Sequence, residues 1–190
     1  FWGPLVDLYS TKRKWIISTQ FSMAVCLFSA AYVLNTEGYF FFSLLAFATC
    51  AFVSATHDIA TDGFYMLALS KESQALFVGI RATFYRLAMI FGSGLLVYTA
   101  GRIETLTGSI PLSWTVVICA AGFVFVLVPL YHTFVLPFPA TDSKRSTREA
   151  TSDIPFLEIF RSYFKQEKIG AIIAFILLYR FAEAMLLKLA

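Results

Sequence analysis

The fold of this chain is decided by one long apolar run, residues 40–69, which reads FFFSLLAFATCAFVSATHDIATDGFYMLAL. A run of about 30 residues forms roughly 45 Å of helix, enough to cross a bilayer core of about 30 Å. Inside the run, residues 54–62 read SATHDIATD and place a histidine and two carboxylates among apolar neighbours. A charged side chain at mid-bilayer costs about 2.5 to 3.5 kcal/mol, so such residues usually mark a pathway, a relay or a binding site.

The two carboxylates, Asp58 and Asp62, are four residues apart and therefore share one face of the predicted helix, which Ser54 and Tyr65 extend. A carboxyl group in a low dielectric resists ionisation and a nearby cation favours it, so such a group can exchange protons during transport. We expect Asp58, Asp62 and His57 to act in proton coupling or substrate binding. The alternative is that the carboxylates pair with arginines and simply hold helices together.

The composition predicts an all-α integral membrane protein. The chain is 58% hydrophobic and 14% charged, whereas soluble domains are roughly 45 to 50% apolar and about 25% charged. A signal peptide does not account for this, because apolar runs recur along the whole length. The chain begins at Phe1 without methionine and ends at Ala190 within an apolar run, so we expect a fragment of a longer protein. We expect five membrane segments, near residues 15–34, 40–69, 74–99, 113–136 and 169–190.

Basic residues give the expected orientation. The loop with Lys12 and Arg13, the connection at Lys71 and the charged linker 137–168 would lie on one side of the membrane and hold ten Lys or Arg, whereas the opposite loops hold only Arg102. This bias predicts that the basic side is cytoplasmic. The linker pattern predicts an amphipathic surface helix, and residues 102–112 are expected to form a loop.

Other ionisable residues lie inside the apolar segments. Arg81 is near the start of the third segment and can reach the membrane surface, whereas Arg86 is deeper and is expected to pair with an acidic residue or an anionic substrate. Arg180 and Glu183 are three apart and share a face, either as an internal ion pair or as cavity residues. Gly92 to Gly94 indicate close helix packing. The three cysteines show no metal-ligand spacing, and no metal, cofactor or nucleic acid is expected.

Several motifs resemble a known transporter family. Residues 3–7 (GPLVD) followed by the basic turn at residues 12–14 resemble the loop between the second and third helices of the major facilitator superfamily. Together with residues 54–62, 79–81 (GIR), 84–88 (FYRLA), 92–94 (GSG) and 179–184 (YRFAEA), the chain resembles AmpG-type muropeptide permeases and, more distantly, acetyl-CoA transporters. In such permeases the residue before the first aspartate is commonly glutamine, and here it is His57.

The resemblance implies a twelve-helix, two-bundle transporter that imports anhydro-muropeptides across a bacterial inner membrane, driven by the proton gradient. We expect it to be a monomer. The chain would run from the end of helix two to helix seven, with residues 1–136 in the N-terminal bundle, 137–168 as the cytoplasmic linker and 169–190 beginning the C-terminal bundle. Asp58 would carry the essential acidic role. We further expect proton-coupling or substrate-binding roles, lining or bracing the cavity, for Tyr85, Arg86, Arg180 and Glu183. The structural loop motif comprises Gly3, Asp7, Lys12 and Arg13.

Two other functions stay open. One is a transporter of the same superfamily for acetyl-CoA or another anionic solute instead of a glycopeptide. The other is an intramembrane phosphotransferase, because Ser54, Asp58 and Asp62 resemble part of the signature with which CDP-alcohol phosphotransferases hold divalent metals. The phosphotransferase signature also needs an upstream Asp-Gly pair followed by Ala-Arg, and none precedes Ser54.

Overall fold

The computed structural model describes Val6, residues 10–139, Asp142, Arg161, Phe164, Lys165 and residues 167–189. The chain divides into two compact units, residues 2–144 and residues 145–190 with residue 1. Every regular element among the described residues is helical, which confirms the all-α prediction. The first unit holds α2 (Lys12–Val33), α3 (Tyr39–Ala68), α4 (Lys71–Ile90), the π-helical turn η1 (Phe91–Leu96), α5 (Val97–Thr107) and α6 (Ile110–Val135), and the second holds α8 (Ile169–Leu189).

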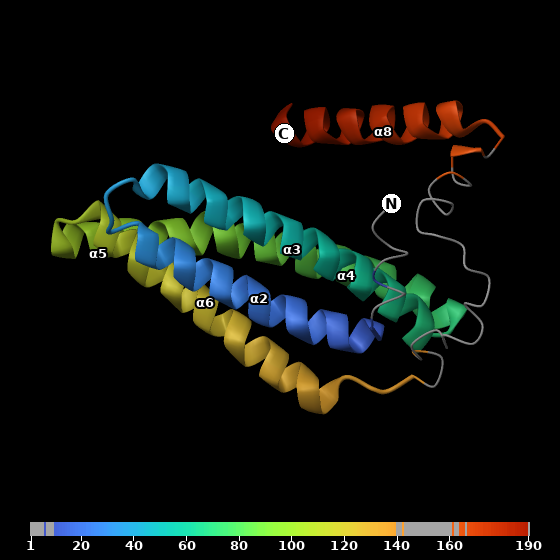
Figure 1. Cartoon of the computed structure of the whole chain (residues 1–190), viewed down its shortest axis with the longest axis horizontal. Coiled ribbons are helices and arrows are strands. Elements are labelled where there is room, and N and C mark those ends of the chain that lie inside the picture. Colours follow the sequence, from blue (N-terminus) through green and yellow to red (C-terminus); the bar gives the residue numbers. More distant parts are fainter. Residues whose placement is uncertain are drawn as a thin grey trace. The chain divides into compact units, whose positions relative to one another are not determined.

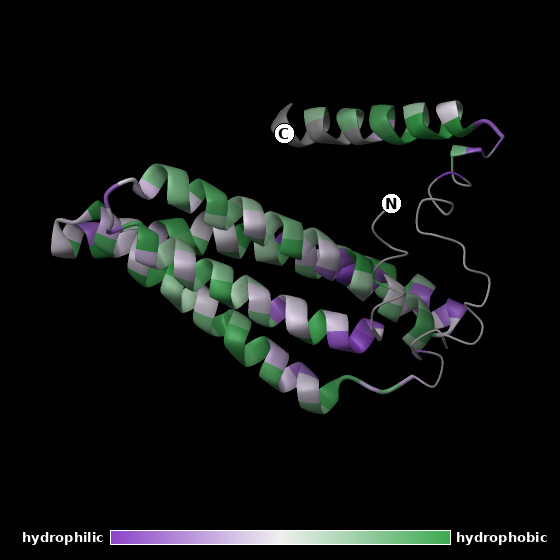
Figure 2. Ribbon diagram, in the orientation of Figure 1, coloured by the Kyte–Doolittle hydropathy of each residue, from purple (hydrophilic) through white to green (hydrophobic). Residues whose placement is uncertain are grey.

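Four stretches are long and apolar enough to cross a membrane: α2, α3, the continuous run from α4 through α5, and α6. Figure 2 shows that apolar residues dominate their length, with hydrophilic residues gathered near the helix ends. In α8, residues 169–179 form a shorter apolar stretch. Many apolar side chains are exposed on these helices. In a bilayer they would contact lipid or further helices, because the bilayer core contains no water. The chain is a multi-pass membrane protein.

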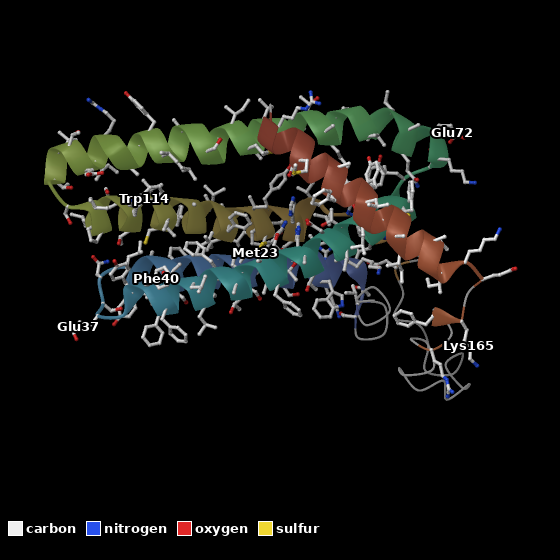
Figure 3. All side chains as sticks on the ribbon, turned by 90° about the horizontal axis from the view of Figure 1, so that it is seen from above. Met23, Glu37, Phe40, Glu72, Trp114 and Lys165 are labelled. Carbon is white, nitrogen blue, oxygen red and sulfur yellow. The ribbon has the colours of Figure 1, made fainter. Side chains whose placement is uncertain are left out.

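The four spans of the first unit run alternately up and down (Figure 1). Glu37, in the turn between α2 and α3, and Glu72, at the start of α4, therefore lie at opposite ends of the unit (Figure 3). The beginning of α2 with Lys12 and the α3–α4 connection before Lys71 share one end, whereas Arg102 in α5 lies toward the other. This arrangement agrees with the side assignment expected from the basic residues.

Helix α2 packs between α3 and α6, and small residues make its contact with α6 close. Ala24, Ala30 and Ala31 of α2 are buried. A Cβ atom added at Gly122 of α6 would lie 3.2 Å from ring carbons of Phe28 on α2. Gly122 thus leaves room for the Phe28 ring, and small residues at helix contacts are a common feature of packing in lipid, where burial of apolar surface gives little drive.

The basic end of the unit has a small apolar core formed by Val6, Ile16 of α2 and Ala60 of α3, all at most 4% exposed. Trp15 packs against this core and donates its indole N–H to the carbonyl oxygen of Val6 at 2.9 Å. The core fixes the register of α2 against the second half of α3, where the ionisable residues lie.

The predicted segments differ from the observed helices mainly around the third span. The expected loop at residues 102–112 is wrong, because helix continues to Thr107 and ends at Gly108 with φ of +68°. Gly101 lies inside α5, since a glycine costs a helix only about 1 kcal/mol. A Cβ added at Gly92 or Gly94 in η1 meets nothing within 4 Å, so the expected close packing is not made within the described part of the chain. The amphipathic helix predicted in the linker falls almost entirely outside the described residues.

Candidate functional site

The second half of α3 presents its two carboxylates in different surroundings. Asp62 accepts a hydrogen bond of 2.7 Å from the Arg81 guanidinium of α4, with both side chains half-exposed. The same guanidinium lies 5.1 Å from the centre of the Tyr65 ring, and the Tyr65 hydroxyl donates to the Gln74 carbonyl. Arg81 thus balances the charge of Asp62 and links α3 to α4, in the structural pairing role considered for these carboxylates.

Asp58, one turn earlier, is held by no such partner. Its side chain is 78% exposed, and Nδ1 of His57 lies 3.9 Å from a carboxylate oxygen. That distance is too long for a hydrogen bond. Asp58 lies ten residues before the end of α3, or about 15 Å along the helix, which is half of a 30 Å bilayer core. Among the described residues, α3 therefore carries one carboxylate that is largely exposed and that no arginine or lysine pairs with.

His57 points to the packed side of α3, toward α2. Its Nε2 lies 3.2 Å from the Gln20 amide nitrogen, and the Gln20 amide oxygen lies 3.0 Å from Nδ1 of His132 on α6. Gln20 is only 5% exposed. Three spans thus contribute one side chain each to a hydrogen-bonded chain. Buried polar groups in a membrane protein are expensive unless they are satisfied in this way.

Two residues of the expected loop motif, Lys12 and Arg13, make contacts at the basic end of the unit. The Asp142 carboxylate accepts from the backbone N–H of Lys12 at 2.8 Å and of Arg13 at 3.0 Å, which caps the first turn of α2. The Arg13 guanidinium donates to the carbonyl oxygens of Leu136 and Thr133 at the end of α6 and lies 3.8 Å above the Phe138 ring. The start of α2 is thereby clamped to the chain that leaves α6.

The remaining candidates are not brought into this group. Tyr85 and Arg86 are exposed on α4, and no described residue pairs with the Arg86 side chain. In the described part of the chain, no three His, Cys, Asp or Glu side chains gather as a metal-ligand set. Two further candidates, Gly3 and Asp7, lie outside the described residues, as do the side chains of Arg180 and Glu183.

Sequence reasoning missed three partners in this region: Gln20, His132 and Arg81 as the base that meets Asp62. Gln20 and His132 lie 37 and 112 positions from the residues they contact, so spacing along one helix gives no hint of the contact. The signal available was that each is a polar side chain within an apolar span, the criterion that drew attention to His57.

The fold and the sequence together define the class of protein. The family model for the major facilitator superfamily matches residues 1–187, so the chain belongs to the major facilitator superfamily of transporters. It is 25% identical over 199 residues to the putative transporter AmpG 4 of Rickettsia conorii, a match that covers 98% of this chain and 45% of that protein. It is 26% identical to the anhydromuropeptide permease of Escherichia coli K12 over 99% of this chain and 37% of that protein.

The chain therefore spans less than half the length of these curated relatives. No solved structure matches it.

Proposed function

We propose that the protein is a secondary transporter of the bacterial inner membrane that imports anhydro-muropeptides together with protons and acts as a monomer. The substrate class rests on similarity to a permease named for anhydromuropeptides, which extends along 99% of this chain. The exposed Asp58 carboxylate in a membrane-spanning helix is the single observation that carries the proton-coupling part.

Asp58 suits proton exchange because of what surrounds it. Asp62 already has its charge balanced by Arg81 at 2.7 Å, whereas the described partner of Asp58 is His57 at 3.9 Å, which is charged only when it is protonated. A carboxylate in a spanning helix can bind a proton while it faces one side of the membrane and release the proton when it faces the other side. Proton coupling by alternating access requires this behaviour. Protonation of the carboxylate removes the cost of an unpaired charge in the membrane. Proton binding is therefore linked to the change between the inward-facing and outward-facing states.

Arg86 gives a reason to test anionic solutes beside glycopeptides. Its guanidinium is exposed on α4 without a described partner, and a guanidinium binds carboxylates and phosphates with two parallel hydrogen bonds. In this proposal the substrate cavity is lined by Tyr85, Arg86, Arg180 and Glu183. Acetyl-CoA is therefore the comparison substrate, and a plain sugar is the uncharged one.

The test is uptake of labelled anhydro-muropeptide by sealed vesicles that carry the full-length protein, with acetyl-CoA and plain sugars as competitors. With an inward proton gradient, Asp58→Asn should abolish accumulation yet retain solute exchange between equal internal and external pools, since exchange needs no net proton transfer. Asp58→Glu, which keeps a titratable group, should retain part of the accumulation. Wild-type accumulation by Asp58→Asn would refute the coupling role, and preference for acetyl-CoA would refute the substrate.

A further inference from the structure

The chain of His57, Gln20 and His132 joins α3, α2 and α6 through one amide. The distances are 3.2 Å from His57 Nε2 to the Gln20 amide nitrogen and 3.0 Å from His132 Nδ1 to the Gln20 amide oxygen. Gln20 is 5% exposed, and both rings are partly buried. The two histidines therefore share a neighbour that is shielded from water, and each must satisfy the end of the amide that faces it.

An amide offers two different ends, since its oxygen only accepts and its nitrogen only donates. In the observed arrangement, His132 donates Nδ1–H to the amide oxygen and His57 accepts at Nε2 from the amide nitrogen. A neutral His57 then carries its own proton on Nδ1, the atom that lies 3.9 Å from the Asp58 carboxylate. The amide thus sets which nitrogen of each ring is protonated.

A positively charged imidazole has N–H donors at both nitrogens and needs the oxygen end of the amide. If His57 is charged, Gln20 must turn its oxygen to His57, and its nitrogen then faces His132, which must accept and so is neutral. If His132 is charged, the opposite holds. Two charged rings would leave one N–H facing the amide N–H in a shielded site. This conclusion is the same for either orientation of the amide.

We infer that His57, Gln20 and His132 form a proton-binding site. Beyond the proton that each neutral ring already carries, the site takes up one additional proton, so that one of the two histidines is positively charged. The Gln20 amide excludes a second additional proton. The two rings titrate as a unit, so the proton affinity belongs to the pair and not to either residue. Binding of the proton at His57 or at His132 also selects the orientation of Gln20. The positive charge can therefore reside on His57 of α3 or on His132 of α6, but not on both at once.

Other charged and titratable groups near the site come from the three packed helices and from α4, and they are Asp58, Asp62, Lys12, Arg13, Tyr131 and Arg81. Asp62 is paired with Arg81, and the Arg13 guanidinium is bound to α6 carbonyls. Asp58 is the charge that faces His57 most directly. The negative charge of Asp58 favours the positive charge on His57 over that on His132.

This inference concerns proton binding, so it does not depend on which solute the protein carries. If Asp58 couples transport to protons, the site gives that coupling a second proton acceptor beside it. Failure of muropeptide uptake would leave the proton site untouched, and failure of the proton site would leave uptake to be explained by Asp58 alone.

The experiment is nitrogen NMR of histidine-labelled full-length protein in lipid nanodiscs, titrated from about pH 8 to about pH 5, the range in which histidine changes charge. His57→Asn and His132→Asn variants assign the two ring signals. We expect wild type to take up about one proton for the pair, and Gln20→Glu to take up about two, because a carboxylate has an acceptor for each ring. Proton uptake at the pair should thus double.

Two outcomes would overturn the inference: both wild-type rings charged at about pH 5, or no proton bound by either ring in this range. Equal proton uptake by wild type and Gln20→Glu would overturn it as well. Gln20→Met, which keeps the side-chain length and removes both ends of the amide, serves if the glutamate variant does not fold. In Gln20→Met the two rings should titrate independently, so that His57→Asn no longer shifts His132, and persistent coupling would contradict the role of the amide.

Discussion

The clamp between Asp142 and the start of α2 gives a prediction whose size follows from the geometry. In Asp142→Ala, the backbone N–H groups of Lys12 and Arg13 lose acceptors at 2.8 Å and 3.0 Å. Loss of an N-terminal cap costs about 0.5 to 2 kcal/mol, and loss of a negative charge at a helix N-terminus costs about 0.3 to 1 kcal/mol. We expect a decrease of about 2 kcal/mol in the free energy of unfolding. Asp142→Asn keeps one carbonyl acceptor and should lose about half as much.

The assay for the clamp is equilibrium unfolding of the full-length protein in mixed detergent micelles, combined with amide hydrogen exchange. Glu37→Ala, in the turn at the opposite end of α2, is the control, and it should change stability by less than about 0.5 kcal/mol. Exchange of the Lys12 and Arg13 amides should accelerate in Asp142→Ala, whereas amides in the middle of α2 should not. If Asp142→Ala unfolds like the control and the first-turn amides stay protected, the capping argument is wrong.

Two further predictions concern contacts between helices. Asp62 and Arg81 should show a coupling energy of about 0.5 to 1 kcal/mol in a double-mutant cycle of unfolding. A double variant with the two residues swapped should recover part of the stability that each single variant loses. If the losses of the two single variants simply add, the pairing is contradicted. Gly122→Leu should cost about 1 to 3 kcal/mol, because its side chain would collide with Phe28. Gly101→Leu, where a Cβ meets nothing within 4 Å in the described part of the chain, should cost clearly less, and equal costs would refute the close packing of α2 with α6.

The position of the spans could be predicted from the sequence because lipid imposes strong conditions on length and apolarity. The run at residues 40–69 is observed as Tyr39–Ala68, bounded by Gly38 with φ of +79° and by Leu69, whose backbone is extended. The expected loop at residues 102–112 is not observed over most of its length, because a single glycine does not by itself end a helix. Helix continues through Gly101 and ends at Gly108, the position that adopts a left-handed conformation.

The acidic residues of α3 could be identified from sequence, but their partners could not. Energetic cost alone singled out Asp58 and Asp62 among apolar neighbours. Which arginine meets Asp62 depends on how α4 turns after Ser70, and the structure places Arg81 there. The Gln20 and His132 contacts depend on the register of α2 against α3 and α6, which is set by small residues and by the core at Ile16. Such register is a property of packing between helices that no single segment encodes.

The most direct test of proton-coupled import is proton movement driven by the solute itself. Anhydro-muropeptide added outside liposomes that carry the full-length protein and a trapped pH indicator should acidify the interior, because each import cycle brings protons with the solute. Asp58→Asn liposomes should show no acidification under the same conditions. Absence of acidification in wild-type liposomes that do take up the solute would contradict the proposed coupling, as would acidification of wild-type size in the Asp58→Asn variant.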